Sequence, residues 1–157
     1  MSKDTWISDI LAGEYDGQEV ELKGWIYRSR GSNKIRFIVV RDSTGNIQCV
    51  AKREALGDDF FDELKSSLIE SSVILKGIVE PTDREHGHEL QVLSGEVVGS
   101  VNPERPFPIT ESAMAEADGG ETEFLLDNRH LYLRTSRMTT MLKIRSSVFG
   151  AVHSYFR

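Results

Sequence analysis

Apolar and polar residues alternate from residue 20 to residue 27. The apolar positions are Val20, Leu22, Gly24 and Ile26. A period of two, with β-branched and aromatic residues, predicts a half-buried strand. Residues 31–33 (Gly-Ser-Asn) interrupt it, and residues 34–42 predict a second strand. Residues 42–45 form a β-turn sequence with Asp first and Gly fourth, so residues 46–52 are expected to return as a third strand.

The period changes in residues 58–70, where apolar residues at helical spacing and an acidic start predict a short helix. These apolar residues are Phe61, Leu64 and Leu68. Residues 72–79 and 89–101 predict two more strands, joined by the polar loop 83–88. Three strands, a helix and two strands is the order of the OB-fold, a five-stranded Greek-key barrel. Another small β-barrel is the alternative, but a helix between strands three and four favours the OB-fold in this mainly β chain.

The remaining sequence predicts a domain boundary. Residues 1–101 form the predicted OB-fold domain, and residues 102–123, with Pro103, Pro106 and Pro108, read as a linker. Residues 124–157 contain a helical pattern from Met138 that reaches the end without a stop signal. Because its apolar stripe has nothing after it to pack on, we expect the chain to be a piece of a longer protein.

The net charge of −6 argues against nucleic-acid binding when taken alone, but the charges are segregated. Basic residues dominate residues 20–42, and residues 128–157 contain basic residues but no acidic ones. A local basic strip matters more for phosphate contact, because salt screens charges over about 8 Å. The lone Cys49 excludes an internal disulfide, and no run approaches the length of a membrane span. These features predict a cytoplasmic protein with no membrane partner.

The sequence contains no recognisable catalytic pattern. The single cysteine and four histidines lack zinc-site spacing, no glycine-rich phosphate loop follows a strand, and no Ser or Cys has a recognisable nucleophile context. The sequence therefore predicts no catalytic residue, no cofactor site and no metal site.

The predicted hairpin instead indicates a binding face. If residues 42–45 form the turn, Arg41 lies opposite Asn46 and Val39 opposite Gln48, so Phe37 and Gln48 share one side. An exposed Phe is a stacking platform for a base, and a neighbouring amide can pair with a base edge. The alternatives are core packing for Phe37 and a solvated polar position for Gln48.

Two arginines end the first predicted strand. Arg28 and Arg30 are two residues apart, share a side and could hold phosphates or stack on bases. The alternative is a solubilising strand edge.

Three segments, Gly24-Trp25-Ile26-Tyr27-Arg28-Ser29-Arg30, Phe37 to Asp42 and Gly45 to Val50, resemble the anticodon-binding domain of aspartyl, asparaginyl and lysyl class II tRNA synthetases. The resemblance includes the eleven-residue step from Phe37 to Gln48. It implies that Phe37 stacks on the middle anticodon uridine, that Gln48 hydrogen-bonds its edge, and that Arg28 and Arg30 hold the loop. It further implies that the loop carrying Arg84 and Glu85 approaches the flanking anticodon bases, although these residues match no fixed motif.

A second resemblance covers residues 126–134 and 142–146. They are similar to the entry into the catalytic domain of these enzymes, where a long helix begins the dimer-forming first class II motif, and the Arg129-His130-Leu131-Tyr132 version looks asparaginyl. The second and third motifs, which would bind ATP, are absent. The implied parent uses ATP and Mg²⁺ to join asparagine to tRNA and is a homodimer through its catalytic domain, whereas this piece is expected to be inactive.

Three other interpretations of the sequence remain open. An aspartyl enzyme can share the same barrel, a free-standing OB module could bind single strands without sequence preference, and a protein-interaction barrel would leave Phe37 unexplained. Replacing the middle anticodon uridine distinguishes the free-standing module from a synthetase domain, because only the synthetase domain should bind the altered loop much more weakly.

Overall fold

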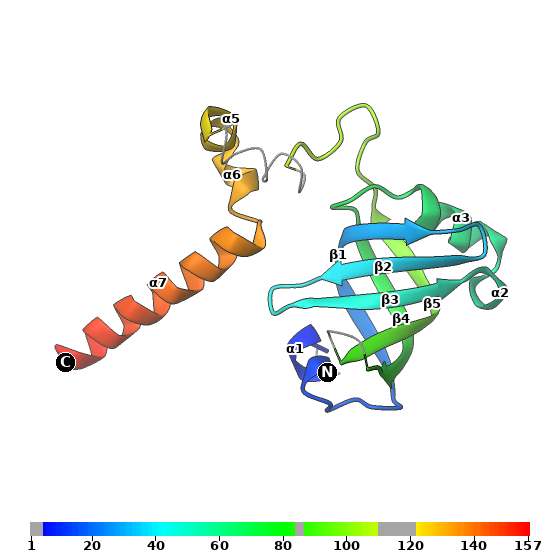
Figure 1. Ribbon diagram of the computed structural model, residues 1–157, viewed down its shortest axis with the longest axis horizontal. Coiled ribbons are helices and arrows are strands. Elements are labelled where there is room, and N and C mark those ends of the chain that lie inside the picture. Colours follow the sequence, from blue (N-terminus) through cyan, green and yellow to red (C-terminus); the bar gives the residue numbers. More distant parts are fainter. Residues whose placement is uncertain (1–4, 84–86, 110–121) are drawn as a thin grey trace. The chain divides into compact units, whose positions relative to one another are not determined.

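A five-stranded barrel forms the first part of the chain in the computed structural model, which describes residues 5–83, 87–109 and 122–157. The order of elements around the barrel is β1-β2-β3-β5-β4, and the barrel is closed (Figure 1). Its strands are β1 (Glu19–Gly31), β2 (Ile35–Arg41), β3 (Asn46–Lys52), β4 (Ser72–Pro81) and β5 (His88–Gly99). Three short helices accompany them: α1 (Ile7–Leu11), α2 (Arg53–Leu56) and α3 (Asp58–Ser66).

The long strand β1 pairs with two neighbouring strands. Its first part pairs antiparallel with β4 and its second part pairs antiparallel with β2. The two pairings meet at Gly24 and Trp25, where a Cβ on Gly24 would lie 2.5 Å from the backbone oxygen of Arg41. Only glycine allows the strands to approach this closely. The register then shifts between Ile26 and Arg28, which leaves Tyr27 in a β-bulge that bends the strand.

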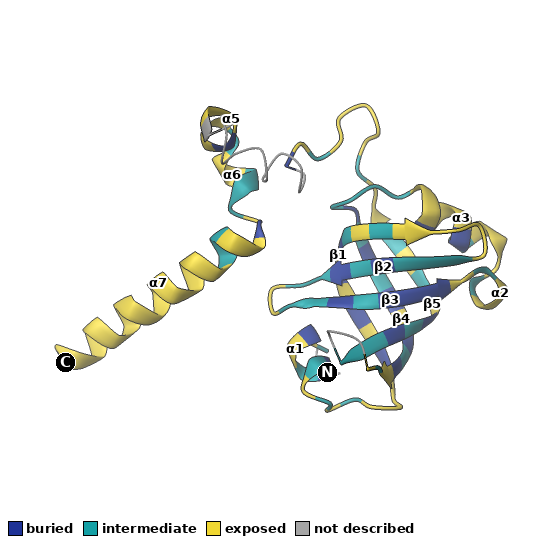
Figure 2. Cartoon of the chain, viewed as in Figure 1, coloured by how far each residue is buried: buried dark blue, intermediate teal, exposed yellow. Residues whose placement is uncertain are grey.

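Alternating residues of the strands fill the barrel interior, as the dark positions in Figure 2 show. The fully buried side chains include Leu22, Ile26, Ile38, Val40 and Leu90. Ile7 and Ile10 of α1 join this core beside the β2–β3 turn, and Leu64 of α3 joins it beyond the other end of β3. The helices therefore cover opposite ends of the barrel (Figure 1).

Two polar contacts fix the C-terminal end of β2. The Asp42 carboxylate accepts hydrogen bonds from the backbone N–H of Thr44 and Gly45, and its other oxygen accepts one from the N–H of Ile7, at 2.9 Å. It thereby joins the turn to α1. The Arg41 guanidinium donates to the Glu70 carboxylate at 2.7 Å, and both side chains are largely buried. This pair ties β2 to the segment that leads into β4.

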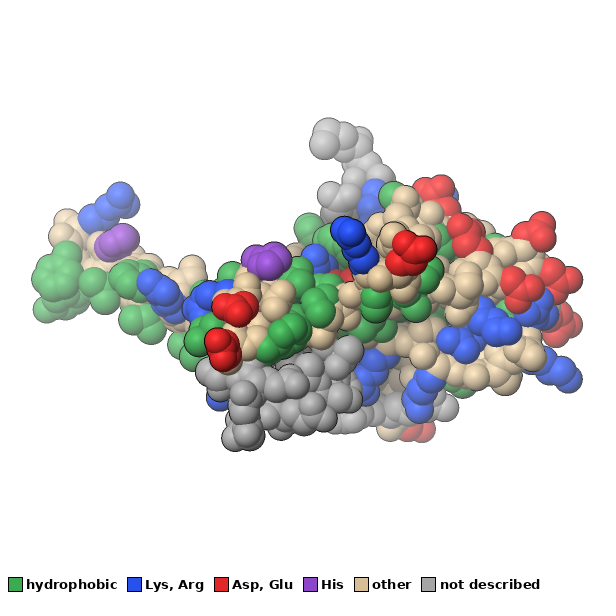
Figure 3. Space-filling view, turned by 90° about the horizontal axis from the view of Figure 1, so that it is seen from above, with side chains coloured by type: hydrophobic (Ala, Val, Ile, Leu, Met, Phe, Trp, Pro, Cys, Tyr) green, Lys and Arg blue, Asp and Glu red, His purple; other side chains and the backbone are tan. Residues whose placement is uncertain are grey.

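The chain divides into two compact units, Met1–Phe107 and Pro108–Arg157. The second contains α5 (Thr122–Asp127), α6 (Arg129–Tyr132) and α7 (Ser136–Tyr155). Thr135 caps α7, because its hydroxyl oxygen accepts a hydrogen bond from the N–H of Met138. Large apolar side chains stay exposed along α7 and at the residue after it, with Tyr155 84% and Phe156 80% accessible (Figure 3). None of the described helices is long and apolar enough to cross a membrane.

The predicted order of strands and helix is confirmed, with different boundaries. β1 contains Arg28 and Arg30 at its end, as predicted, and also includes Gly31, whereas the helix predicted at 58–70 ends at Ser66. Four short helices within the described residues were not predicted: α1, α2, α5 and α6. Each has four to six residues, too few to show a helical period in the sequence.

Candidate nucleic-acid interface

The β2–β3 hairpin places Phe37 and Gln48 on one outward face. The register pairs Arg41 with Asn46, Val39 with Gln48 and Phe37 with Val50, so Phe37 and Gln48 are diagonal neighbours. The residues between them on β2 and β3 point inward, since Ile38 and Cys49 have no exposed surface. Phe37 and Gln48 are both partly exposed. The predicted register is therefore confirmed, and the Phe37 ring does not belong to the buried core.

Two arginines of β1 border the same face. Arg28 pairs with Val39 and Arg30 with Phe37, and both side chains are exposed. The Arg30 guanidinium lies 5.7 Å from the centre of the Phe37 ring, within the range of a cation–π contact. Arg28 lies 6.0 Å from the ring of Tyr27, the bulged residue. Positive charge and aromatic surface thus occur together across β1 and β2.

On the other side of Gln48 lies a residue that the sequence analysis missed. β3 pairs in parallel with β5, and Gln48 is the partner of Glu89. The Gln48 amide nitrogen donates to a Glu89 carboxylate oxygen at 3.1 Å, and the Gln91 amide nitrogen donates to the other oxygen at 2.9 Å. Period-two spacing in the sequence puts Glu89 and Gln91 on one side of their strand. It does not reveal that this side lies next to Gln48, because the pairing of β3 with β5 depends on the barrel topology.

The loop between β4 and β5 is only partly described. Arg84 and Glu85, predicted to approach the flanking anticodon bases, lie outside the described residues. The loop closes at its base, where the N–H of Thr82 donates to the carbonyl of Gly87 at 2.9 Å. The His88 imidazole lies 2.8 Å from the Asp16 carboxylate and is mostly buried.

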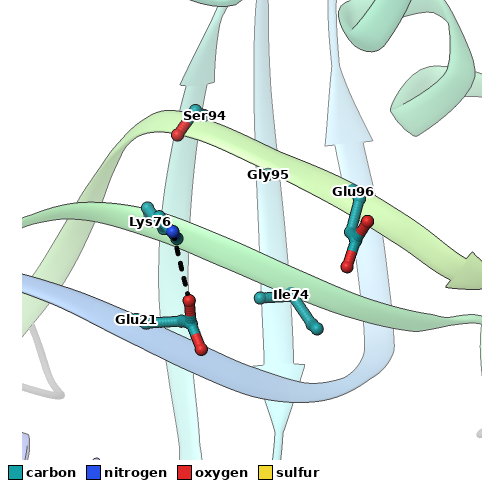
Figure 4. Close-up of a pocket in the computed structure, with 6 residues that line it drawn as sticks. All are labelled: Glu21, Ile74, Lys76, Ser94, Gly95 and Glu96. Carbon is teal, nitrogen blue, oxygen red and sulfur yellow. Dashed lines mark ion pairs between the residues drawn. The ribbon is translucent and has the colours of Figure 1, made fainter. Parts of the chain in front are cut away.

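The pocket in Figure 4 lies among β1, β4 and β5 and is lined by charged and small side chains. Its residues are Glu21, Ile74, Lys76, Ser94, Gly95 and Glu96. Lys76 lies 3.3 Å from the Glu21 carboxylate, and with Lys23 it lowers the pKa of that group. No aromatic side chain lines this pocket, so a base would have no ring to stack on there.

Within the described part of the chain, no cluster of three or more His, Cys, Asp or Glu side chains could hold a metal ion. Cys49 is fully buried, and burial raises the pKa of its thiol, so the sulfur stays protonated and unreactive. The geometry instead presents an aromatic ring, an amide and two arginines on one strand face, which is how OB-folds bind single-stranded nucleic acid.

Comparison with known families agrees with this geometry. Residues 20–98, just over half of the chain, match the tRNA anti-codon family, described as an OB-fold nucleic acid binding domain. The chain belongs to this family.

Its relatives are more specific. The chain is 42% identical over 151 residues to the asparagine–tRNA ligase of Thermoplasma acidophilum, covering 96% of this chain and 33% of that enzyme. It is 37% identical to that of Koribacter versatilis, covering 92% of this chain and 31% of the enzyme. The crystal structure of asparaginyl-tRNA synthetase from Pyrococcus horikoshii complexed with asparaginyl-adenylate matches 99% of this chain and 34% of its own, with a TM-score of 0.84 and 32% identity. The chain thus spans about a third of these relatives, and the resemblance to asparaginyl enzymes is confirmed.

Proposed function

We propose that this chain recognises the anticodon loop of tRNA as the OB-fold portion of an asparagine–tRNA ligase. The observation that supports this most strongly is the shared face of Phe37 and Gln48, bordered by Arg28 and Arg30. The Phe37 ring stacks on the middle anticodon base, and the Gln48 amide hydrogen-bonds its edge. The two arginines hold the phosphates of the loop.

Each role follows from the chemistry of an unpaired RNA loop. Bases splayed out of a loop expose both a π-face and a hydrogen-bonding edge, and proteins meet these with aromatic rings and polar side chains. Exposed arginines on a neighbouring strand supply the positive charge that the backbone requires. Arg84 and Glu85 remain candidates for contact with the flanking bases, through the loop that joins β4 to β5.

A binding assay tests the proposal against a barrel that binds any single strand. Anticodon stem-loops differing only at the middle position are titrated into the chain. We expect the stem-loop with uridine to bind at least roughly tenfold more tightly than stem-loops with cytidine or a purine, the lower range for a good side-chain contact to a base. Equal binding of all four stem-loops would show a general single-strand binder and refute the proposal.

The longer protein would carry out the reaction. We propose that it is a cytoplasmic enzyme that uses ATP and Mg²⁺ to activate asparagine and transfer it to tRNA. In this proposal the 157-residue chain contributes recognition of tRNA, and the rest of the enzyme contributes the reaction. The exposed apolar side chains of α7 would be covered in the longer protein, which we propose is a homodimer through its catalytic domain.

A further inference from the structure

We propose that Glu89 is a positioning residue that fixes the orientation of the Gln48 amide and thereby makes the site select uracil over cytosine. This inference rests on the proposed function, because it concerns the base that Gln48 reads. The residues that carry it are Gln48, Glu89 and Gln91.

The nitrogen end of the Gln48 amide faces Glu89. An ionised carboxylate only accepts hydrogen bonds, so the atom of Gln48 that lies 3.1 Å from it must be the amide nitrogen. The usual ambiguity between the oxygen and nitrogen of a glutamine is resolved here by the partner. A turned amide would place its oxygen against the negative carboxylate.

The Glu89 carboxylate is itself held in place by a second hydrogen bond. Its other oxygen accepts a hydrogen bond from the Gln91 amide at 2.9 Å, and its backbone is paired with Gln48 in the β3–β5 ladder. Both partners lie on barrel strands rather than on a loop. Glu89 therefore presents a fixed acceptor to Gln48 before any ligand arrives.

The orientation of the Gln48 amide determines which hydrogen-bonding groups it offers to a ligand. Among the described residues, the Gln48 amide donates one N–H to Glu89, which leaves its oxygen and its second N–H, one acceptor beside one donor, for a ligand. The Watson–Crick edge of uracil carries an N3–H donor beside carbonyl acceptors, which complements this pair. Cytosine carries an N3 acceptor beside an amino donor, the reverse pattern.

Gln48 alone would not distinguish uracil from cytosine. A glutamine whose amide turns freely offers either pattern and would pair with uracil or cytosine. Glu89 excludes the turned state, so cytosine meets an acceptor facing its N3 acceptor. Discrimination then comes from the groups that would be left unpaired or repelled with the wrong base.

The test measures binding of the complete 157-residue chain to two stem-loops that carry uridine or cytidine at the middle position. The Glu89→Gln variant replaces the carboxylate by an amide of nearly the same size and shape, so the acceptor that fixes Gln48 is lost. We expect the ratio of the two dissociation constants to fall by roughly tenfold, mainly because the cytidine stem-loop binds more tightly. Glu96→Gln, the same exchange on β5 within the pocket of Figure 4, should keep the unaltered ratio.

The outcomes separate the two proposals. If the unaltered chain binds both stem-loops equally, the proposed function fails, and this inference fails with it. If the unaltered chain prefers uridine and Glu89→Gln preserves the preference, only the role of Glu89 is refuted. The Glu89→Asp variant, whose shorter side chain moves the carboxylate away from Gln48, should also reduce the ratio of the two dissociation constants. If neither variant folds, nuclear Overhauser contacts between the Gln48 amide protons and the Glu89 side chain decide, because a freely rotating amide would overturn the inference.

Discussion

Phe37→Ala is expected to weaken binding of the uridine-containing anticodon stem-loop by about 1–3 kcal/mol, the value of stacking one base on an aromatic side chain. The Phe37 ring is partly exposed on the outer face of β2, whereas the next residue, Ile38, is buried in the core. Loss of the ring therefore removes a contact surface rather than a core side chain. Isothermal titration calorimetry at fixed salt measures the change, since binding to phosphates depends strongly on ionic strength.

Matched variants separate stacking from other effects of the substitution. Phe37→Tyr keeps an aromatic face and should bind nearly as well as the unaltered chain, whereas Phe37→Leu keeps apolar volume without the ring and should lose most of the stacking. Phe156→Ala makes the same substitution at an exposed position of the other unit and should leave affinity unchanged. An unchanged affinity in folded Phe37→Ala would show that no base stacks on this ring.

Gly77→Ala is expected to lower the free energy of unfolding of the barrel by about 3 kcal/mol, the upper end of the range for overpacking. Gly77 is buried on β4 at the register shift against β5, and an added Cβ would lie 2.2 Å from the backbone oxygen of Gln91. Because backbone, unlike a flexible side chain, cannot turn away, the two strands must separate. Urea unfolding measured by circular dichroism gives the change.

Gly99→Ala is the control for this prediction. It lies near the end of β5, where an added Cβ would meet only the hydroxyl of Ser72, at 3.0 Å. That hydroxyl can rotate, so a loss within about 1 kcal/mol is expected. Equal stability of the two variants would contradict the close approach of β4 and β5 at Gly77.

The β2–β3 hairpin could be predicted in detail because its register depends on nearby residues. The Asp42–Gly45 turn fixes which residues lie opposite each other, and alternation then puts Phe37 and Gln48 on one side. Exposure decided between the interpretations of Phe37, since strand alternation identifies a face without saying which face is outside.

The pairing of Gln48 with Glu89 could not be predicted in the same way. The two residues are 41 positions apart and meet through a parallel pairing of β3 with β5. Local periodicity carries no signal for such contacts. The bulge at Tyr27 also escaped prediction, because alternation alone does not reveal an extra residue in one strand.

Photo-crosslinking tests the central claim most directly. A stem-loop with 5-iodouridine at the middle anticodon position is irradiated in complex with the chain, and the modified peptide is sequenced by mass spectrometry. Stacking of this base on the outer face of β2 predicts an adduct on Phe37. An adduct confined to other parts of the chain, with Phe37 unmodified, would contradict the mechanism.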